Sequence, residues 1–119
     1  MAHILISITH STNDADKATV GFVIANAAVA SDQETTIFLS CEGVRLAQRA
    51  TVDGIHEDGF AALSELVENF LEAGGNLLVC SPCAKKRGIG EADVITGAQI
   101  VGGARVVELL AAGATGLSY

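Results

Sequence analysis

Short apolar runs alternate along the whole chain with longer segments that repeat apolar residues at helical spacing. The short runs predict strands over residues 3–9, 35–40, 76–80, 99–101 and 116–119. The longer segments predict helices over residues 14–30, 43–50, 60–73, 83–87 and 104–112, with a further turn or short helix over 91–96 and a polar loop over 51–59. Strands that alternate with helices are typical of a parallel sheet covered by helices on both faces. The pattern therefore predicts an α/β fold.

The predicted helix over residues 14–30 differs from an ordinary surface helix. Apolar residues follow one stripe, and Val20, Val23 and Ile24 extend that stripe nearly all the way round. A helix that is apolar on most sides is either deeply buried or part of a subunit interface. This segment and the Ala/Gly-rich C-terminal segment both favour an oligomer.

Length and charge narrow the class of protein. The chain has 119 residues, half of them hydrophobic, so we expect one domain over residues 1–119 with a core of its own. It carries 7 basic and 14 acidic residues, a net charge of −7, which argues against binding to nucleic acid or to anionic membranes. We find neither a secretory signal nor an apolar stretch of about 20 residues. We therefore expect a cytoplasmic protein in which the three cysteines form no structural disulfide.

Candidate chemistry gathers at one edge of the predicted sheet. In open α/β sheets ligands bind beyond the carboxyl ends of the strands. His10 follows the first predicted strand, Cys41 follows the second, and Cys80 and Cys83 lie where the third ends. The sequence therefore predicts that all three cysteines and one histidine share an edge.

The segment Cys80-Ser81-Pro82-Cys83 has a distinctive electrostatic setting. It lies where a strand passes into a predicted helix, whose free N–H groups favour an anion. The only dense basic run in the chain follows this segment directly and consists of Lys85, Lys86 and Arg87. Both effects lower the pKa of a thiol and increase its thiolate fraction, which is the nucleophilic form.

A Cys-x-x-Cys pair alone leaves several interpretations open. A zinc site needs four ligands, which Cys80, Cys83, Cys41 and His10 could supply. No second Cys-x-x-Cys or histidine pair is present, so we predict no metal and no cofactor. Three interpretations remain. The pair is a redox dithiol, or it carries sulfur as a thiolate, or the protein is a non-catalytic binding subunit in which the cysteines are only packed side chains. His10 is either a base or hydrogen-bond donor near the thiols, or simply solvated.

The order of these segments resembles a known family over essentially the whole chain. The residues that carry the resemblance are Cys41-Glu42-Gly43-Val44 after the second strand, and Val79-Cys80-Ser81-Pro82-Cys83-Ala84-Lys85-Lys86-Arg87-Gly88 after the third. The chain is similar to the DsrE/DsrF-like (YchN-like) family. The resemblance implies a three-layer α/β/α fold with a five-stranded, mainly parallel sheet, assembled as a homotrimer or homohexamer.

The resemblance also implies a chemistry. Sulfur-relay members carry their sulfur-accepting cysteine at the position of Cys80, so we expect Cys80 to accept sulfane sulfur from a donor protein and pass it to an acceptor protein. Cys83 would resolve the persulfide, and Lys85, Lys86 and Arg87 would supply a positive field. The Cys-Ser-Pro-Cys form is similar to stand-alone members often called predicted peroxiredoxins, which keeps a Cys80–Cys83 redox dithiol as an alternative.

Overall fold

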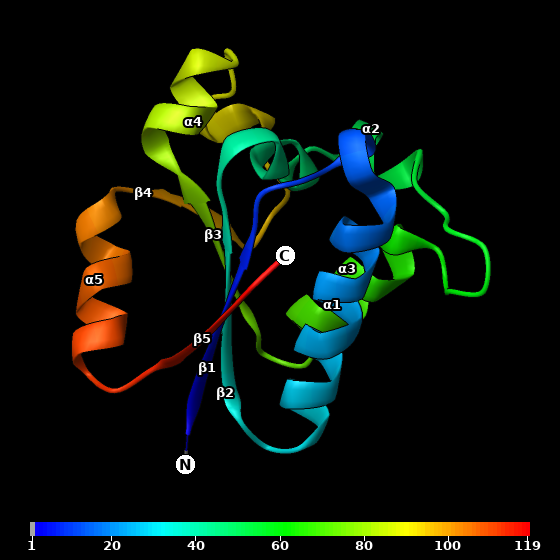
Figure 1. Ribbon diagram of the computed structural model, residues 1–119. Helices are drawn as coiled ribbons and strands as arrows, with labels where there is room; N and C mark the ends of the chain where they lie inside the picture. Colours follow the sequence, from blue (N-terminus) through cyan, green and yellow to red (C-terminus); the bar gives the residue numbers. More distant parts are fainter. Residues whose placement is uncertain (1) are drawn as a thin grey trace.

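Five parallel strands form a single sheet at the centre of the molecule (Figure 1). The computed structural model describes residues 2–119. The strand order is β4-β3-β2-β1-β5, and all four pairings are parallel. The strands are β1 (His3–Ile8), β2 (Glu34–Leu39), β3 (Asn76–Cys80), β4 (Ala98–Val101) and β5 (Thr115–Ser118).

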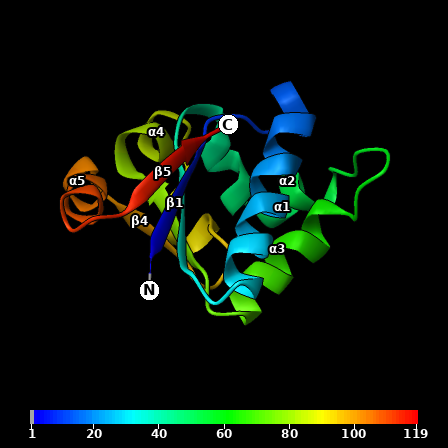
Figure 2. The same cartoon turned by 60° about the horizontal axis from the view of Figure 1, so that its bottom comes forward.

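Helices cover both faces of this sheet, so the predicted three-layer α/β/α fold is confirmed. Helices α1 and α3 lie on one face and α5 lies on the other (Figures 1 and 2). The α-helices are α1 (Ala15–Ala30), α2 (Arg49–Asp53), α3 (Leu63–Glu72), α4 (Ser81–Lys86) and α5 (Gly103–Ala111), and the 3-10 helices are η1 (Thr12–Asp14), η2 (Cys41–Ala47) and η3 (Glu91–Asp93). Between residues 2 and 119, no helix combines the length and the apolarity needed to cross a membrane.

The main core lies between the sheet and the layer formed by α1 and α3. Alternate strand residues point to opposite faces of a sheet, and the central strands direct Ile6, Ile37 and Val79 into this core. The rings of Phe22 in α1 and Phe70 in α3 meet edge to face, with their centroids 6.0 Å apart. Such pairs add to the stability that burial provides.

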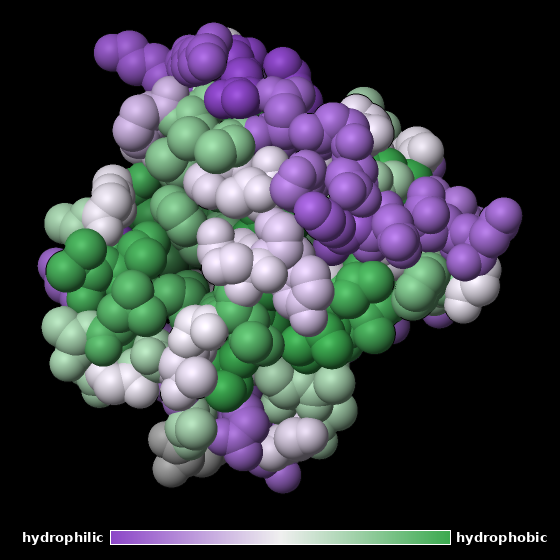
Figure 3. All heavy atoms as spheres, in the orientation of Figure 1, coloured by the Kyte–Doolittle hydropathy of each residue, from purple (hydrophilic) through white to green (hydrophobic). Residues whose placement is uncertain are grey.

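The opposite face is much less complete. None of the residues of α5 is buried, and Val107 and Leu110 in this helix are 65% and 45% exposed. A groove of about 230 Å³ lies between α5 and the sheet, lined by residues that include Leu5, Phe38 and Leu110. Figure 3 shows hydrophobic atoms gathered on the side of the molecule where α5 lies.

Two of the helices predicted before β3 differ from the structure. The helix predicted over 43–50 is wrong, because Gln48 adopts an extended backbone that separates η2 from α2, and α2 also takes the first residues of the predicted loop over 51–59. The helix predicted over 60–73 begins only at Leu63, because Ala62 is extended and the N–H of Leu63 donates to the carbonyl of Ile55 instead.

Candidate functional site

The third strand delivers two cysteines to the edge of the sheet. Strand β3 ends at Cys80, which is the N-cap of α4, and Pro82 lies in the first turn of that helix. The sequence pattern predicts that this helix begins at Cys83, and that prediction is wrong because α4 begins at Ser81. The earlier start puts Cys83 within the first helical turn, where its N–H faces the sulfur of Cys80.

The second strand delivers the third cysteine. Cys41 begins η2 with a φ of +53°, in the left-handed region that non-glycine residues seldom occupy. Two backbone bonds hold this turn on the end of β1: Ser40 N–H donates to the Ile8 carbonyl at 3.1 Å, and Gly43 N–H donates to the Thr9 carbonyl at 3.1 Å. The turn directs the N–H of Cys41 toward the sulfur of Cys83.

An ion pair fastens the two segments to each other. Arg87, at the end of α4, donates from Nε to Glu42 Oε2 and from a terminal nitrogen to the Cys83 carbonyl, the latter at 3.1 Å. Arg45 donates to the other oxygen of Glu42 at 3.0 Å. Hydrogen bonds from Arg87 first, and then from Arg45, hold the pKa of Glu42 below its ordinary value. Glu42 is therefore charged at neutral pH and anchors α4 to η2.

The pKa values of the two half-buried cysteines are shifted in opposite directions. Burial is the main reason that the pKa of Cys80 is raised, and the neighbouring Cys83 raises it further. Burial also acts to raise the pKa of Cys83, but the N–H of Cys41, the thiol of Cys80 and the charge of Arg87 together lower it. The lowered thiol pKa expected for this segment is therefore found at Cys83 and not at Cys80, and the thiolate is favoured at Cys83.

The remaining predicted site residues take unequal parts. Arg87 touches the site, whereas Lys85 and Lys86 are exposed. His10 follows β1 at the same edge, and its ring Nδ1 pairs with Thr9 Oγ1 at 3.1 Å rather than with a thiol. The structure therefore unites Cys41, Cys80, Cys83 and Arg87 and leaves His10 to one side.

Glu42 belongs to the site although the sequence pattern did not indicate it as a functional residue. A signal was available, because Glu42 follows β2 and Arg87 ends the helix after β3, and the two strands are neighbours. Opposite charges beyond adjacent parallel strands are well placed to pair.

The three thiols are arranged in sequence rather than around a common centre. Cys80 influences the pKa of Cys83, and Cys83 in turn is influenced by Cys41. Within residues 2–119, no group of three or more His, Cys, Asp or Glu side chains is arranged to hold a metal ion. Cys41 is exposed, whereas Cys80 and Cys83 are half-buried. This arrangement suits exchange between thiols, in which one sulfur attacks the next.

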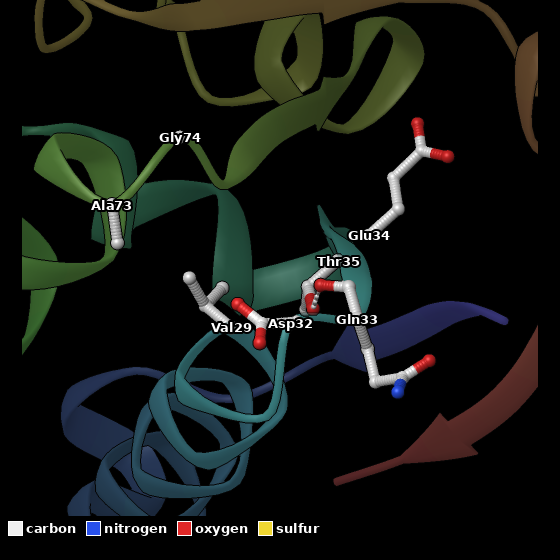
Figure 4. A pocket seen from close by; sticks show the side chains of 7 residues that line it. All are labelled: Val29, Asp32, Gln33, Glu34, Thr35, Ala73 and Gly74. Atoms are coloured by element: carbon white, nitrogen blue, oxygen red, sulfur yellow. Dashed lines mark hydrogen bonds between the residues drawn. The ribbon is translucent and has the colours of Figure 1, made fainter. Parts of the chain in front are cut away.

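A larger hollow lies at the other end of the sheet and carries no comparable chemistry. It has a volume of about 390 Å³ and is lined by the loop between α1 and β2 and by the end of α3 (Figure 4). The labelled side chains include Asp32 and Glu34 but no thiol or histidine. The cysteines lie beyond the opposite ends of the strands.

These features define a three-layer α/β protein with an all-parallel sheet of five strands and a thiol site at its carboxyl edge. Residues 2–119 match the model of the DsrE/DsrF-like family. The chain therefore belongs to the DsrE/DsrF-like family, which confirms the resemblance found in the sequence.

Two uncharacterized proteins are similar to the chain in sequence. The chain is 34% identical over 94 residues to the uncharacterized protein MJ0760 of Methanocaldococcus jannaschii, a match that covers 79% of this chain but 34% of that protein, so the chain spans about a third of its length. It is 30% identical over 97 residues to the uncharacterized protein MK0008 of Methanopyrus kandleri, which covers 82% of this chain and 77% of that one.

Solved structures support the fold. The YchN protein of E. coli is similar with a TM-score of 0.84 and 17% identity, and the match covers 100% of both chains. The protein of unknown function MTH1491 from Methanobacterium thermoautotrophicum is similar with a TM-score of 0.73 and 18% identity, again over 100% of both chains. These matches establish a YchN-like fold.

Proposed function

We propose that the protein is a sulfur-relay protein that accepts sulfane sulfur as a persulfide on the Cys80–Cys83 pair and passes it to the thiol of a partner protein. The observation that carries this proposal is the pairing at the sheet edge, where the thiol of Cys80 supports a thiolate at Cys83. Sulfur acceptance needs a thiolate, because the thiolate is the nucleophilic form. Family membership supports the same class of chemistry.

The acceptance step is an exchange between sulfur atoms. The Cys83 thiolate attacks the outer sulfur of a donor persulfide, the donor's S–S bond breaks, and the donor leaves as a thiolate. The proposal assigns the attack to Cys83 and the supporting proton to Cys80, whereas the sequence favoured Cys80 as the acceptor. A raised pKa leaves Cys80 protonated at neutral pH, so Cys80 is the poorer nucleophile of the pair.

Intact-protein mass spectrometry tests the proposal. Reduced protein is exposed to cysteine persulfide, with the wild type compared with Cys80→Ser, Cys83→Ser and the double variant. We expect a gain of one sulfur atom in the wild type, a slower gain in Cys80→Ser and none in Cys83→Ser. A gain that vanishes only with Cys80→Ser returns the acceptor role to Cys80, and a gain that survives in the double variant overturns the proposal.

A redox dithiol is the second candidate, favoured by the contact between Cys80 and Cys83. In that case the pair would form a disulfide by giving two electrons and two protons to an oxidised partner disulfide. The same mass spectra separate the two functions. A loss of two hydrogens that needs both cysteines, without a gain of sulfur, identifies the dithiol.

We also propose that the working protein is a homotrimer or homohexamer that meets separate donor and acceptor proteins. The exposed apolar residues of α5 and the groove beneath that helix support an assembly. A larger apolar surface on a protein commonly marks an interface.

A further inference from the structure

We propose that Cys41 is the hand-over thiol of this site: the sulfur moves inside the protein from Cys83 to Cys41, and the partner thiol takes it from there. This inference rests on the proposed function and adds a residue and a direction to it. Neither follows from the Cys-Ser-Pro-Cys segment itself.

The first support is the position of Cys41 beside Cys83. Strands β2 and β3 are neighbours, with Leu39 opposite Val79, so the segments that follow them meet at the same edge. The pair of Arg87 with Glu42 then draws α4 onto η2. Both the N–H and the thiol of Cys41 act on the sulfur of Cys83. The pairing of the strands and the contacts of Arg87 with Glu42 and with the Cys83 carbonyl therefore bring the segments that carry Cys41 and Cys83 together.

The second support is a gradient of exposure across the three thiols. Cys80 and Cys83 are half-buried and Cys41 is exposed. A protein-sized acceptor must bring its own thiolate in line with an S–S bond, which needs open space around the sulfur under attack. Cys41 offers that space, so a persulfide on Cys41 is easier to reach than one on Cys83.

The third support is the backbone conformation at Cys41. A left-handed φ is unfavourable for an L-residue, and the turn that imposes it on Cys41 is held by the backbone bonds to β1. Strain of this kind is often found at functional sites. Here the strained turn sets the N–H of Cys41 against the sulfur of Cys83.

The transfer balances without an oxidant or a reductant. Cys41 gives its proton to water, and its thiolate attacks the outer sulfur of the Cys83 persulfide. A bond forms between Cys41 Sγ and that sulfur, and the bond from the sulfur to Cys83 breaks. The electron pair of the broken bond stays on Cys83 as a thiolate. The surroundings that stabilise a thiolate at Cys83 also make it a good leaving group.

The test separates loading from hand-over. Wild type, Cys41→Ser and Cys41→Gly are loaded with cysteine persulfide, and the loss of the added sulfur is followed by mass spectrometry with two acceptors. One acceptor is 2-mercaptoethanol, and the other is a polyethylene glycol thiol too bulky to reach half-buried sulfur. Cys41→Gly is the matched control for the backbone, because it keeps the N–H and suits the positive φ while it removes the thiol.

We expect both variants to load, although more slowly than the wild type, because the thiol of Cys41 no longer supports the thiolate of Cys83. Hand-over is therefore measured on fully loaded protein, as the rate with the bulky thiol relative to the rate with 2-mercaptoethanol. Transfer to the bulky thiol should slow by about tenfold or more, which is ~1.4 kcal/mol in the barrier. Equal rates of transfer to the bulky thiol in wild type and both variants overturn the inference and leave the proposed function standing. Release of hydrosulfide from the wild type with a Cys41–Cys83 disulfide also overturns it, because Cys41 then attacks the inner sulfur. A wild type that does not load overturns the proposed function, and this inference with it.

Discussion

Gly43 determines how closely the turn after β2 approaches β1. A Cβ at this position would lie 2.1 Å from the carbonyl oxygen of Ile8 and 2.9 Å from its carbonyl carbon. Both are backbone atoms within a paired strand, so they have little freedom to move. The absence of a side chain at Gly43 therefore allows the turn that places Cys41 beside Cys83.

Replacement of Gly43 by Ala should destabilise the fold. Forced overpacking costs typically 1–3 kcal/mol, and we expect Gly43→Ala to lower the free energy of unfolding by about that amount in urea titration. Gly54→Ala is the matched control, because its φ is −87° and the nearest atoms to an added Cβ are at 3.5 Å. The control should be neutral or slightly stabilising. Equal stability of the two variants would contradict this account of Gly43.

The sequence predicts which residues meet at the site better than it predicts their electrostatics. The carboxyl-edge rule brings Cys41, Cys80 and Cys83 together because it depends only on strand order and direction. The order of the thiol pKa values depends on burial of Cys80 and on the N–H of Cys41, which points at Cys83 only after the left-handed turn has formed. The burial of Cys80 and the direction of the Cys41 N–H both depend on tertiary structure, so no local sequence pattern predicts them.

At the level of elements, the sequence predicts the strands well and the short helices poorly. Strand β3 (Asn76–Cys80) matches its prediction in full, because its apolar run is bounded by glycine before it and by Ser-Pro after it. The segment Cys41–Ala47 is a 3-10 helix with Val44, Leu46 and Ala47 buried. So short a segment gives no clear period, and only the contact of Gly43 with β1 decides its geometry.

The contact between α4 and η2 should control the reactivity of Cys83. Arg87→Met removes a positive charge and a link to Glu42, so we expect the pKa of Cys83 to rise. The thiolate then appears only at higher pH. The rate of alkylation by iodoacetamide, measured as a function of pH in a protein that keeps Cys83 but carries Cys41→Ser and Cys80→Ser, should shift to higher pH.

Lys86→Met in the same background is the control for charge alone, because Lys86 is exposed and carries the same charge as Arg87. It should leave the profile almost unchanged. Equal shifts in the two variants would mean that net charge, and not the contact made by Arg87, sets the reactivity of Cys83.

At the scale of the molecule, the two helical layers differ in how well they cover the sheet. The layer of α1 and α3 buries large side chains such as Phe22, Leu63 and Phe70 completely. The layer of α5 buries none of its own residues and leaves Val107, Leu110 and Leu117 exposed. Figure 3 shows hydrophobic atoms on that side of the molecule. Exposed apolar surface costs free energy in water at roughly 25 cal/mol per Å². A second copy of the chain on this face would remove that cost.

This asymmetry predicts where the proposed assembly can be broken. We expect light scattering at micromolar concentration to give the mass of a trimer or hexamer for the wild type. Val107→Asp should give a monomer, because an unpaired carboxylate is costly to bury in an interface. Ala27→Asp is the matched control: Ala27 is exposed on α1, in the opposite layer, so its charge should leave the mass unchanged. Circular dichroism on both variants verifies that the helices remain folded.

A monomeric wild type would contradict the assembly. A Val107→Asp variant of unchanged mass would exclude the α5 face, and dissociation by Ala27→Asp alone would move the interface to α1.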